Sequence, residues 1–343
     1  MENSVMPCPL AVKGPETPVC LSDVSVKDAQ WDKHRAATQT VGTLYGITTK
    51  HAKLANRMAS CSTHLLFAKQ HQEAKRQWRL KNAFFCKVRH CPVCQWRRAV
   101  RNTRRVFERL PLLEDQLPEV RWLFLTLTVK NPPMADLRET IKRMNKAWAR
   151  LIERQEWPAV GWLRAVEVTK GQDGNPHPHF HVMLAVKPSY YGKRYITQQR
   201  WLELWREAMR DDTITQVDIR AVKDKTGQGD LKAAIVETLK YAYKPEDTFN
   251  DSAFLYGLTD QLHKMRFLAS GGILKGILKE DPSNAEMLAG DEPKESADTG
   301  EVMLAKWNRS VKRYHVISPD AGYTYRKGLY EVKNKPYRRG RVY

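Results

Sequence analysis

The sequence has no apolar run long enough to cross a membrane, and its first residues lack the features of a secretory signal. Met1–Leu21 carries prolines and acidic residues where a signal peptide has a basic start and an apolar stretch. Acidic residues are scarce overall: 38 Asp and Glu stand against 58 Lys and Arg, so the formal net charge is +20. We therefore expect a cytoplasmic protein without a membrane partner, whose charge suits a polyanion such as nucleic acid.

Cysteine is also rare, at 6 residues, but four of the six have the spacing of a metal site. These four are Cys61, Cys86, Cys91 and Cys94. Clustered cysteines in a reducing compartment indicate a metal and not disulfides, and four thiolates would close a structural Zn²⁺ site. Plant-type ferredoxins share the C-x4-C-x2-C spacing, but their fourth cysteine lies downstream, and none follows Cys94. The fourth ligand stays open, because His64 or His90 could replace a thiol.

Apolar alternation and helical periodicity predict the order β-α-β-β-α-β-α in the middle of the chain. The expected strands are 121–129, 160–169, 179–186 and 216–222, and the expected helices are 134–154, 196–210 and 231–244. Strands 160–169 and 179–186 flank a Gly/Pro-containing turn and should form a hairpin. The fold class is therefore α+β with an antiparallel sheet.

Changes in composition divide the chain into five parts. They are a flexible N-terminus (1–30), a helical, basic, cysteine-rich module that binds zinc and DNA (31–115), a catalytic domain (116–279), an acidic disordered linker (280–303) and a basic C-terminal segment (304–343). The linker assignment depends on eight acidic residues and a single lysine between Glu280 and Glu301, with no apolar stripe.

Three of the 10 histidines lie within the five residues His177–His181, at the start of a predicted strand. Side chains two apart in a strand share a face, so His179 and His181 point the same way, and His177 is assigned to the preceding turn. Glu167, on the partner strand of the hairpin, could complete a two-histidine, one-carboxylate site for a divalent ion. The same three ligands could hold iron in an oxygenase, although small organic substrates do not need so basic a protein.

A second constellation lies on the predicted helix 231–244. Glu237, Tyr241 and Lys244 are spaced to share one helical face, whereas Tyr243 points away from it. A carboxylate one turn before a tyrosine and a lysine one turn after it could activate the phenol as a nucleophile. Taken alone, an ordinary packing stripe explains this helix better.

The segment from Lys69 to Arg109 holds thirteen Lys and Arg but two Glu. Five arginines there are spaced along the face of a helix: Arg97, Arg98, Arg101, Arg104 and Arg105. Such runs are often only solvated surface, but beside a metal site in a protein of charge +20 we expect them to contact phosphates.

Three segments, in this order, resemble the motifs of replication initiators of small rolling-circle plasmids. They are Thr126-Leu-Thr-Val-Lys-Asn131, Pro178-His-Phe-His-Val182 and Glu237-x-x-Lys-Tyr-x-x-Lys244. Those initiators are HUH endonucleases, named for a His-hydrophobe-His motif, and the third segment is similar to that of their single-tyrosine branch. The resemblance extends over roughly residues 31–280. It implies a ferredoxin- or RRM-like HUH nuclease domain, and it favours a catalytic Tyr241 over the packing explanation.

The resemblance also implies a mechanism. Mg²⁺ or Mn²⁺ at His179, His181 and Glu167 would polarise a DNA phosphate, and Tyr241 would attack it to form a 5′-phosphotyrosine and release a 3′-hydroxyl primer. Glu237 would activate water at termination, and Lys244 would stabilise phenolate or bind phosphate. The similar cysteine pattern of these initiators favours zinc over an iron–sulfur cluster.

The partners implied by the resemblance are the double-stranded plasmid origin, single-stranded DNA, and a host helicase and polymerase. The sequence leaves the oligomeric state open. Two other functions remain: an HUH transposase with the same chemistry, and a non-catalytic DNA-binding regulator on the same fold.

Overall fold

The computed structural model describes residues 19–72, 75–114, 119–222, 229–239, 251–279, 298–317, 323–326 and 329–332. The chain divides into two compact units. Unit 1 comprises Met1–Cys94 and Pro282–Tyr343, and unit 2 comprises Gln95–Asp281. No helix within the described residues is both long and apolar enough to cross a membrane.

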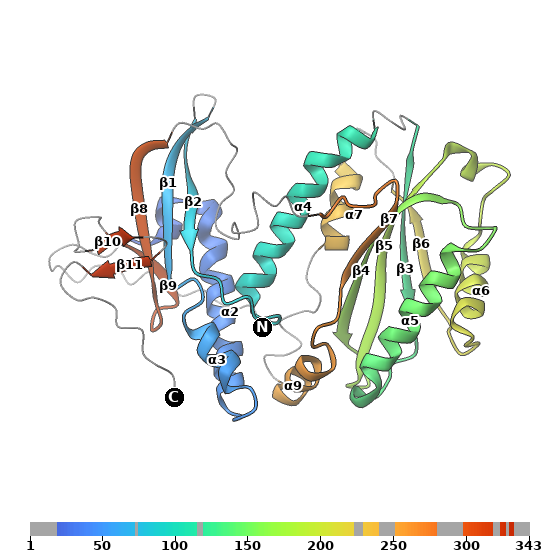
Figure 1. Cartoon of the computed structure of the whole chain (residues 1–343), viewed down its shortest axis with the longest axis horizontal. Helices are drawn as coiled ribbons and strands as arrows, with labels where there is room; N and C mark the ends of the chain where they lie inside the picture. Colours follow the sequence, from blue (N-terminus) through green and yellow to red (C-terminus); the bar gives the residue numbers. More distant parts are fainter. Residues whose placement is uncertain are drawn as a thin grey trace. The chain divides into compact units, whose positions relative to one another are not determined.

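Unit 2 is a five-stranded antiparallel sheet with helices on both faces (Figure 1). The strand order is β6-β3-β5-β4-β7. The strands are β3 (Arg121–Thr128), β4 (Ala159–Lys170), β5 (Pro176–Val186), β6 (Val217–Ala221) and β7 (Leu268–Gly272). The helices are η2 (Met134–Asp136), α5 (Leu137–Ile152), η3 (Pro188–Tyr191), α6 (Gln198–Met209), α7 (Gly229–Leu239) and α9 (Ser252–Gln261). The α+β class, the antiparallel sheet and the predicted order of elements up to α7 are confirmed.

The β4–β5 hairpin sets the register of the sheet's central strands. Its turn is closed by hydrogen bonds from the Gly171 amide to the Asn175 carbonyl (2.8 Å) and from the Gly174 amide to the Gly171 carbonyl (3.0 Å). Gly174 has φ +80°, a conformation that costs glycine little and other residues more. The turn therefore fixes which residues of β4 face which residues of β5.

Each face of this sheet packs against different helices. Phe180, Val182, Leu184 and Val186 of β5 belong to one apolar core, together with α5, α6 and α9. The intervening residues Met183 and Ala185 belong to a second core on the other face, which includes residues of α7 and of the C-terminal half of α4 (Pro92–Glu114). Figure 1 shows α5 and α7 on opposite sides of the sheet. The alternation of β5 predicted from the sequence is present.

Unit 1 contains a four-stranded antiparallel sheet in the order β2-β1-β8-β9 and a separate β10–β11 hairpin. Its strands are β1 (His64–Gln72), β2 (Lys75–Ala83), β8 (Asp298–Asn308), β9 (Arg313–Ile317), β10 (Tyr323–Arg326) and β11 (Leu329–Val332). Its helices are α1 (Leu21–Val24), η1 (Val26–Asp28), α2 (Ala29–Gly46) and α3 (Ala52–Ala59), and α4 begins in this unit.

Two predictions for this region are wrong in part. The 31–115 module is not simply helical, because β1 and β2 lie within it. The predicted linker 280–303 does not extend to its expected end, because β8 begins at Asp298 and Met303 is buried. The rest of that linker, 280–297, lies outside the described residues. Both errors have one cause: β8 is paired with β1, more than two hundred positions away, and local patterns do not reveal such pairing.

The N-terminal prediction needs a similar correction. Residues 19–30 were expected to be flexible, but Leu21 is buried and helical structure begins there. The Val316 amide donates a hydrogen bond to the Val19 carbonyl (2.8 Å), and the backbones of Cys20 and His315 form an isolated antiparallel β-bridge. This segment is ordered by β9, a distant part of the chain. Residues 1–18 lie outside the described part.

Candidate functional site

Glu167, His179 and His181 meet on one face of the sheet in unit 2. Glu167 lies directly opposite His179 in the β4–β5 register, and His181 follows two positions later on the same face. Glu167 Oε2 is 3.1 Å from His179 Nε2 and 2.8 Å from His181 Nε2, and the two Nε2 atoms are 3.1 Å apart. Neighbouring ligands of an octahedral ion at about 2.1 Å lie about 3.0 Å from one another. The three atoms are therefore spaced as ligands of one small divalent ion.

The groups behind the two imidazoles fix which nitrogen faces the centre. His179 Nδ1 lies 3.2 Å from the His177 carbonyl oxygen, which can only accept, so Nδ1 carries the proton. His181 Nδ1 lies 3.4 Å from the Thr126 hydroxyl of β3, which can accept in the same way. Both Nε2 lone pairs are then available for an ion, as in histidine metal sites whose other nitrogen donates to a protein group.

The carboxylate of Glu167 is held in its charged form. Burial opposes ionisation, but the closeness of His179 and His181 outweighs it and lowers the pKa of Glu167 well below its usual range. All three side chains are buried, with Glu167 4% exposed. A buried anion beside two neutral nitrogen donors needs a cation to balance its charge. Donor type, spacing and charge thus all fit a divalent metal.

His177 does not lie in a turn, as the sequence suggested, but in β5, opposite Thr169. Because β5 begins at Pro176, His177 shares a face with His179, and their ring centroids are 5.3 Å apart. Sequence reasoning also missed Asn131, whose Oδ1 lies 2.7 Å from His177 Nδ1. The period-two spacing of the three histidines was the available signal, but the proline-containing turn before them obscured the start of the strand.

The helix that carries Glu237 packs on the same face of the sheet as these ligands. Ala234, Ile235 and Leu239 of α7 lie in one core with Met183, the next residue on that face of β5 after His181. Glu237 is partly exposed on this helix. Tyr241 and Lys244 lie outside the described residues, just beyond the end of α7. Figure 1 shows α7 alongside β4 and β5.

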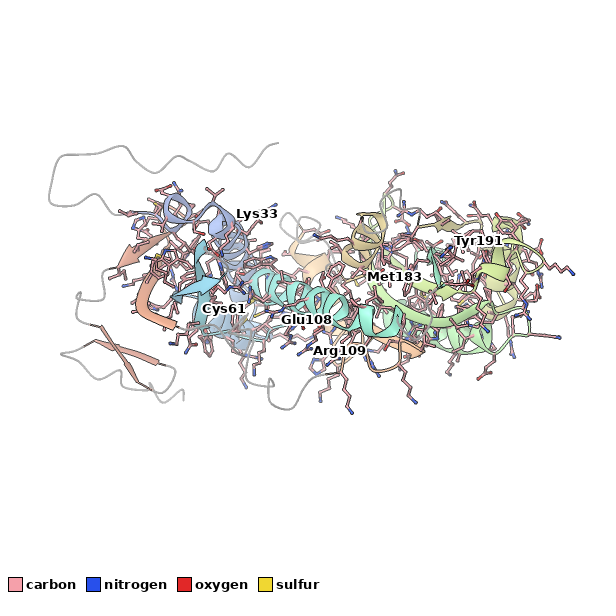
Figure 2. The ribbon with its side chains drawn as sticks, turned by 90° about the horizontal axis from the view of Figure 1, so that it is seen from above. Lys33, Cys61, Glu108, Arg109, Met183 and Tyr191 are labelled. Atoms are coloured by element: carbon pink, nitrogen blue, oxygen red, sulfur yellow. The ribbon has the colours of Figure 1, made fainter. Side chains whose placement is uncertain are left out.

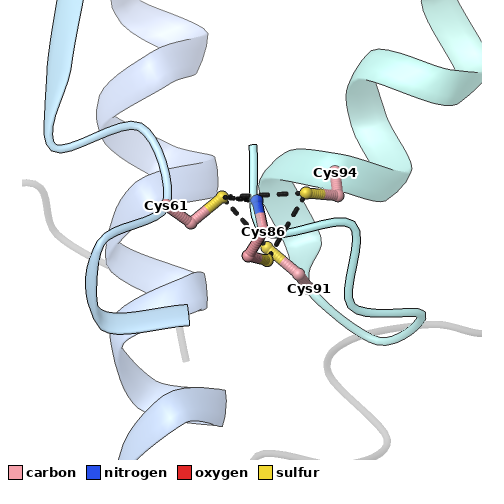
Figure 3. A group of neighbouring side chains, drawn as sticks. All are labelled: Cys61, Cys86, Cys91 and Cys94. Carbon is pink, nitrogen blue, oxygen red and sulfur yellow. Dashed lines mark hydrogen bonds between the residues drawn. The ribbon is translucent and has the colours of Figure 1, made fainter. Parts of the chain in front are cut away.

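In unit 1 the four clustered cysteines come together from separate segments (Figure 3). Cys61 follows α3, Cys86 follows β2, Cys91 precedes α4, and Cys94 lies in its first turn. The sulfurs of Cys61 and Cys94 are 3.7 Å apart, those of Cys86 and Cys94 3.6 Å, and those of Cys91 and Cys61 3.6 Å. Thiolates arranged tetrahedrally at about 2.3 Å from Zn²⁺ lie about 3.8 Å apart. All four are buried free cysteines, so the spacing fits a tetrahedral metal site.

The surroundings of these sulfurs also suit thiolates bound to a cation. The Cys86 amide donates to Cys61 Sγ (3.5 Å), and the Thr38 hydroxyl lies 3.5 Å from Cys91 Sγ. Hydrogen bonding among the four sulfurs, together with burial, raises the pKa of Cys61 well above its usual value. Four neighbouring thiolates therefore require a cation to neutralise them. Neither His64 nor His90 is needed as a ligand.

The five predicted phosphate-contacting arginines all lie on α4, but they differ in exposure. Arg97 is buried, 8% exposed, and its guanidinium lies 5.6 Å from the centroid of the Trp96 ring. Arg104 forms an ion pair with Glu108 at 2.6 Å. Arg98, Arg101 and Arg105 are partly exposed. Figure 2 shows Glu108 and Arg109 further along this helix.

Comparison with known proteins shows what kind of chain carries these sites. A family model described as "Replication protein" matches residues 77–315. A protein named "Protein rep" from Streptococcus pneumoniae serotype 2 (strain D39 / NCTC 7466) is 32% identical over 301 residues, covering 84% of this chain and 92% of that protein. A "Protein rep" from Bacillus amyloliquefaciens is 32% identical over 312 residues, covering 82% and 89%. A Staphylococcus aureus "Replication protein" is 32% identical over 217 residues, covering 59% and 92%. No solved structure matches the chain significantly.

Proposed function

Because this chain belongs to the replication protein (Rep) family of plasmid initiators, we propose that it starts rolling-circle replication by nicking one strand of the plasmid origin. The observation that carries the proposal is the convergence of Glu167, His179 and His181 on the face of the sheet that α7 covers. A divalent-ion site and a helix leading to a tyrosine then lie on the same side of the sheet. Phosphoryl transfer to Tyr241 would need the phenol beside the ion, and a helix on this face that precedes Tyr241 in the chain supports the proposal.

Glu167, His179 and His181 would hold Mg²⁺ or Mn²⁺, which acts as a Lewis acid on the scissile phosphate when it is bound. Tyr241 would attack the phosphorus in line. A bond forms between its phenol oxygen and phosphorus, and the bond from phosphorus to the 3′ oxygen breaks. The phenol proton passes to a nearby base, and the leaving 3′ oxygen takes up a proton from water. The products are a 5′-phosphotyrosine and a 3′-hydroxyl that primes synthesis.

Glu237, four residues before Tyr241, and Lys244, three residues after it, would assist the tyrosine. A lysine near the phenol lowers the cost of forming phenolate, or pairs with the phosphate. Glu237 would act at termination, where a single-tyrosine enzyme needs water as its second nucleophile. Its partial exposure supports access of water to the carboxylate.

The four-cysteine site would hold a structural Zn²⁺ that organises unit 1, since its ligand spacing fits that ion. The arginines of α4 would contact DNA phosphates and help to recognise the double-stranded origin. Arg98, Arg101 and Arg105 are better placed for this than the buried Arg97. A cytoplasmic location and host helicase and polymerase partners follow from the proposed role.

A nicking assay on a supercoiled plasmid carrying the origin tests the proposal. Wild-type protein should nick with added Mn²⁺ and not with a chelator, and a covalent DNA–peptide adduct should map to Tyr241 by mass spectrometry. Tyr241→Phe should abolish the adduct but retain origin binding, whereas Tyr243→Phe should form it normally. An adduct at Tyr243, or metal-independent nicking, would refute the assignment.

The two alternative functions are less well supported. The relatives named above are replication proteins, which does not favour a transposase. A non-catalytic regulator would have no need for three converging ligands, and the nicking assay distinguishes it directly.

A further inference from the structure

The segment that follows β5 carries two exposed tyrosines whose rings pack against a buried tyrosine. Tyr191 is 47% exposed and Tyr195 is 59% exposed, although large aromatic side chains usually bury most of their surface. Tyr191 ends η3 and is labelled in Figure 2. These two tyrosines, together with Tyr190 between β5 and α6, are called here the tyrosine patch.

Tyr190 anchors the patch and keeps its rings in place. It is buried, 3% exposed, and its hydroxyl donates to the Ile196 carbonyl at 3.2 Å. The indole N–H of Trp201 in α6 donates to the same hydroxyl at 3.4 Å. The Tyr190 ring centroid lies 5.3 Å from that of Tyr191 and 5.7 Å from that of Tyr195. The exposed rings therefore rest on a packed one, which reduces the conformational entropy they lose on binding a ligand.

The charge around the patch has one sign. Lys187, Lys193 and Arg194 are exposed, and the sequence has no acidic residue between Lys187 and Leu202. Arg121 of β3 pairs with Val186, next to Lys187. Within the part of the chain that the structure describes, none of these four cations forms an ion pair with a carboxylate. Aromatic faces among unpaired cations are the features by which proteins bind single-stranded nucleic acid.

We propose that the tyrosine patch is a docking surface for single-stranded DNA, on which bases stack against Tyr191 and Tyr195 while the four cations contact the phosphates. A duplex would not use the rings, because its base faces are already stacked. An acidic protein partner would use the cations but would not need exposed base-sized rings. The molecule that fits the patch is therefore a flexible polyanion whose aromatic rings have unstacked faces, as single-stranded DNA has.

This inference rests on the proposed function, since a nicking enzyme must hold a melted strand near its ion. The same strand, β5, connects the patch to the metal ligands. His181 and Lys187 are six residues apart, which is about 20 Å along a strand.

Binding of fluorescent oligothymidine about 20 nucleotides long, measured by anisotropy without added divalent ions, tests the patch directly. The double variant Tyr191→Leu/Tyr195→Leu keeps apolar bulk but loses the rings, and its affinity should fall at least about fivefold. The matched variant Tyr191→Trp/Tyr195→Trp should bind as well as wild type. Lys193→Gln/Arg194→Gln should reduce the salt dependence of binding by about 1.4 in slope, and the exposed α5 variant Lys146→Gln should not.

Photocross-linking of the same strand containing 5-bromouracil gives a second readout. Cross-links should map by fragmentation to Tyr191 within the tryptic peptide 171–193 and to Tyr195 within the peptide 195–200. Unchanged affinity of the double leucine variant, or cross-links confined to other peptides, would overturn the proposal. Adduct formation on an origin oligonucleotide is scored separately. A wild-type protein that forms no adduct refutes the proposed function, whereas one that forms the adduct while the leucine variant binds normally refutes only the patch.

Discussion

Asn131 fixes the orientation of His177 beside the candidate metal ligands. Its Nδ2 donates to Asp173 Oδ1 at 2.9 Å, so its Oδ1 is the acceptor that lies 2.7 Å from His177 Nδ1. His177 must then carry its proton on Nδ1 and leave its Nε2 lone pair available. The loop after β3 thus sets the hydrogen-bonding state of a ring on β5, next to His179.

This relationship predicts one tautomer for His177. Burial is the main cause that lowers the pKa of His177 below its ordinary value, so the ring should be neutral at pH 7 with its proton on Nδ1. Asn131→Ala should abolish this preference, and Asn131→Asp, which keeps an acceptor, should retain it. Long-range ¹H–¹⁵N correlation spectra of the imidazoles measure the tautomer. A proton on Nε2 in the wild type would contradict the prediction.

Loss of Glu167 should weaken binding of Mn²⁺ at the three-ligand site. Even changes behind a metal ligand cost about 10–100-fold in affinity, so Glu167→Ala should cost at least that much. Titration calorimetry or Mn²⁺ electron paramagnetic resonance measures the affinity. The control is Glu139→Gln, whose side chain is exposed on α5. Equal affinity in the wild type and Glu167→Ala would mean that the carboxylate is not a ligand.

Protein purified without oxygen should contain one zinc per chain, held by four sulfurs. Cys61→Ser and Cys94→Ser should each lose the zinc, and unit 1 should unfold at a lower temperature because binding free energy is lost with it. Cys20→Ser is the matched control, since Cys20 is also buried but is not in the cluster. Elemental analysis and thermal melts measure both effects. A coloured protein that contains iron would contradict the zinc assignment and indicate an iron–sulfur cluster at the four cysteines.

Removing β8 should disorder unit 1 and leave unit 2 folded. β8 is an inner strand between β1 and β9, so a chain that stops at residue 297 exposes the inner edge of β1. Amides of β1 should then exchange rapidly with deuterium while those of β5 stay protected. A chain that stops at Ile317 keeps β8 and β9 and serves as the control. Protected β1 amides in the shorter chain would show that unit 1 does not need β8.

Acid should destabilise the protein partly through His34 on α2. Burial first, and then the charge of Lys33, lower the pKa of His34 to about 4 in the folded state, against about 6.5 when unfolded. Well above pH 6.5 the His34 imidazole is neutral in both states. Between pH 6.5 and 4 the unfolded state gains a proton that the folded state does not, so stability falls as the pH falls, and below pH 4 the loss is complete.

The comparison that isolates this effect is wild type against His34→Gln. Between pH 7 and pH 5 the wild type should lose up to about 2 kcal/mol more stability than the variant, because the variant cannot take up this proton. Urea unfolding at both pH values measures the difference. Zinc content is measured in both proteins at both pH values, so that loss of the metal is accounted for separately. Parallel losses in the two proteins would contradict the prediction.

The β4–β5 hairpin shows how much of the candidate site followed from sequence. The two-residue period placed His179 and His181 on one face, and a short turn limited the register enough to bring Glu167 opposite them. Such pairing is local, so chain connectivity alone nearly determines it. The role of Tyr241 remains a prediction, because that residue lies outside the described part.

By itself, then, the sequence determined the antiparallel sheet of unit 2, the face that bears the histidines and the cysteines that could bind a metal. Only the tertiary structure decided that β8 completes the sheet of unit 1, that Cys61 provides the fourth sulfur at 3.7 Å from Cys94, and that Asn131 orients His177. The physical reason is sequence separation. These contacts close long loops between segments with no shared periodicity, and they form because burial and hydrogen bonding in the whole fold outweigh the entropy of closing those loops.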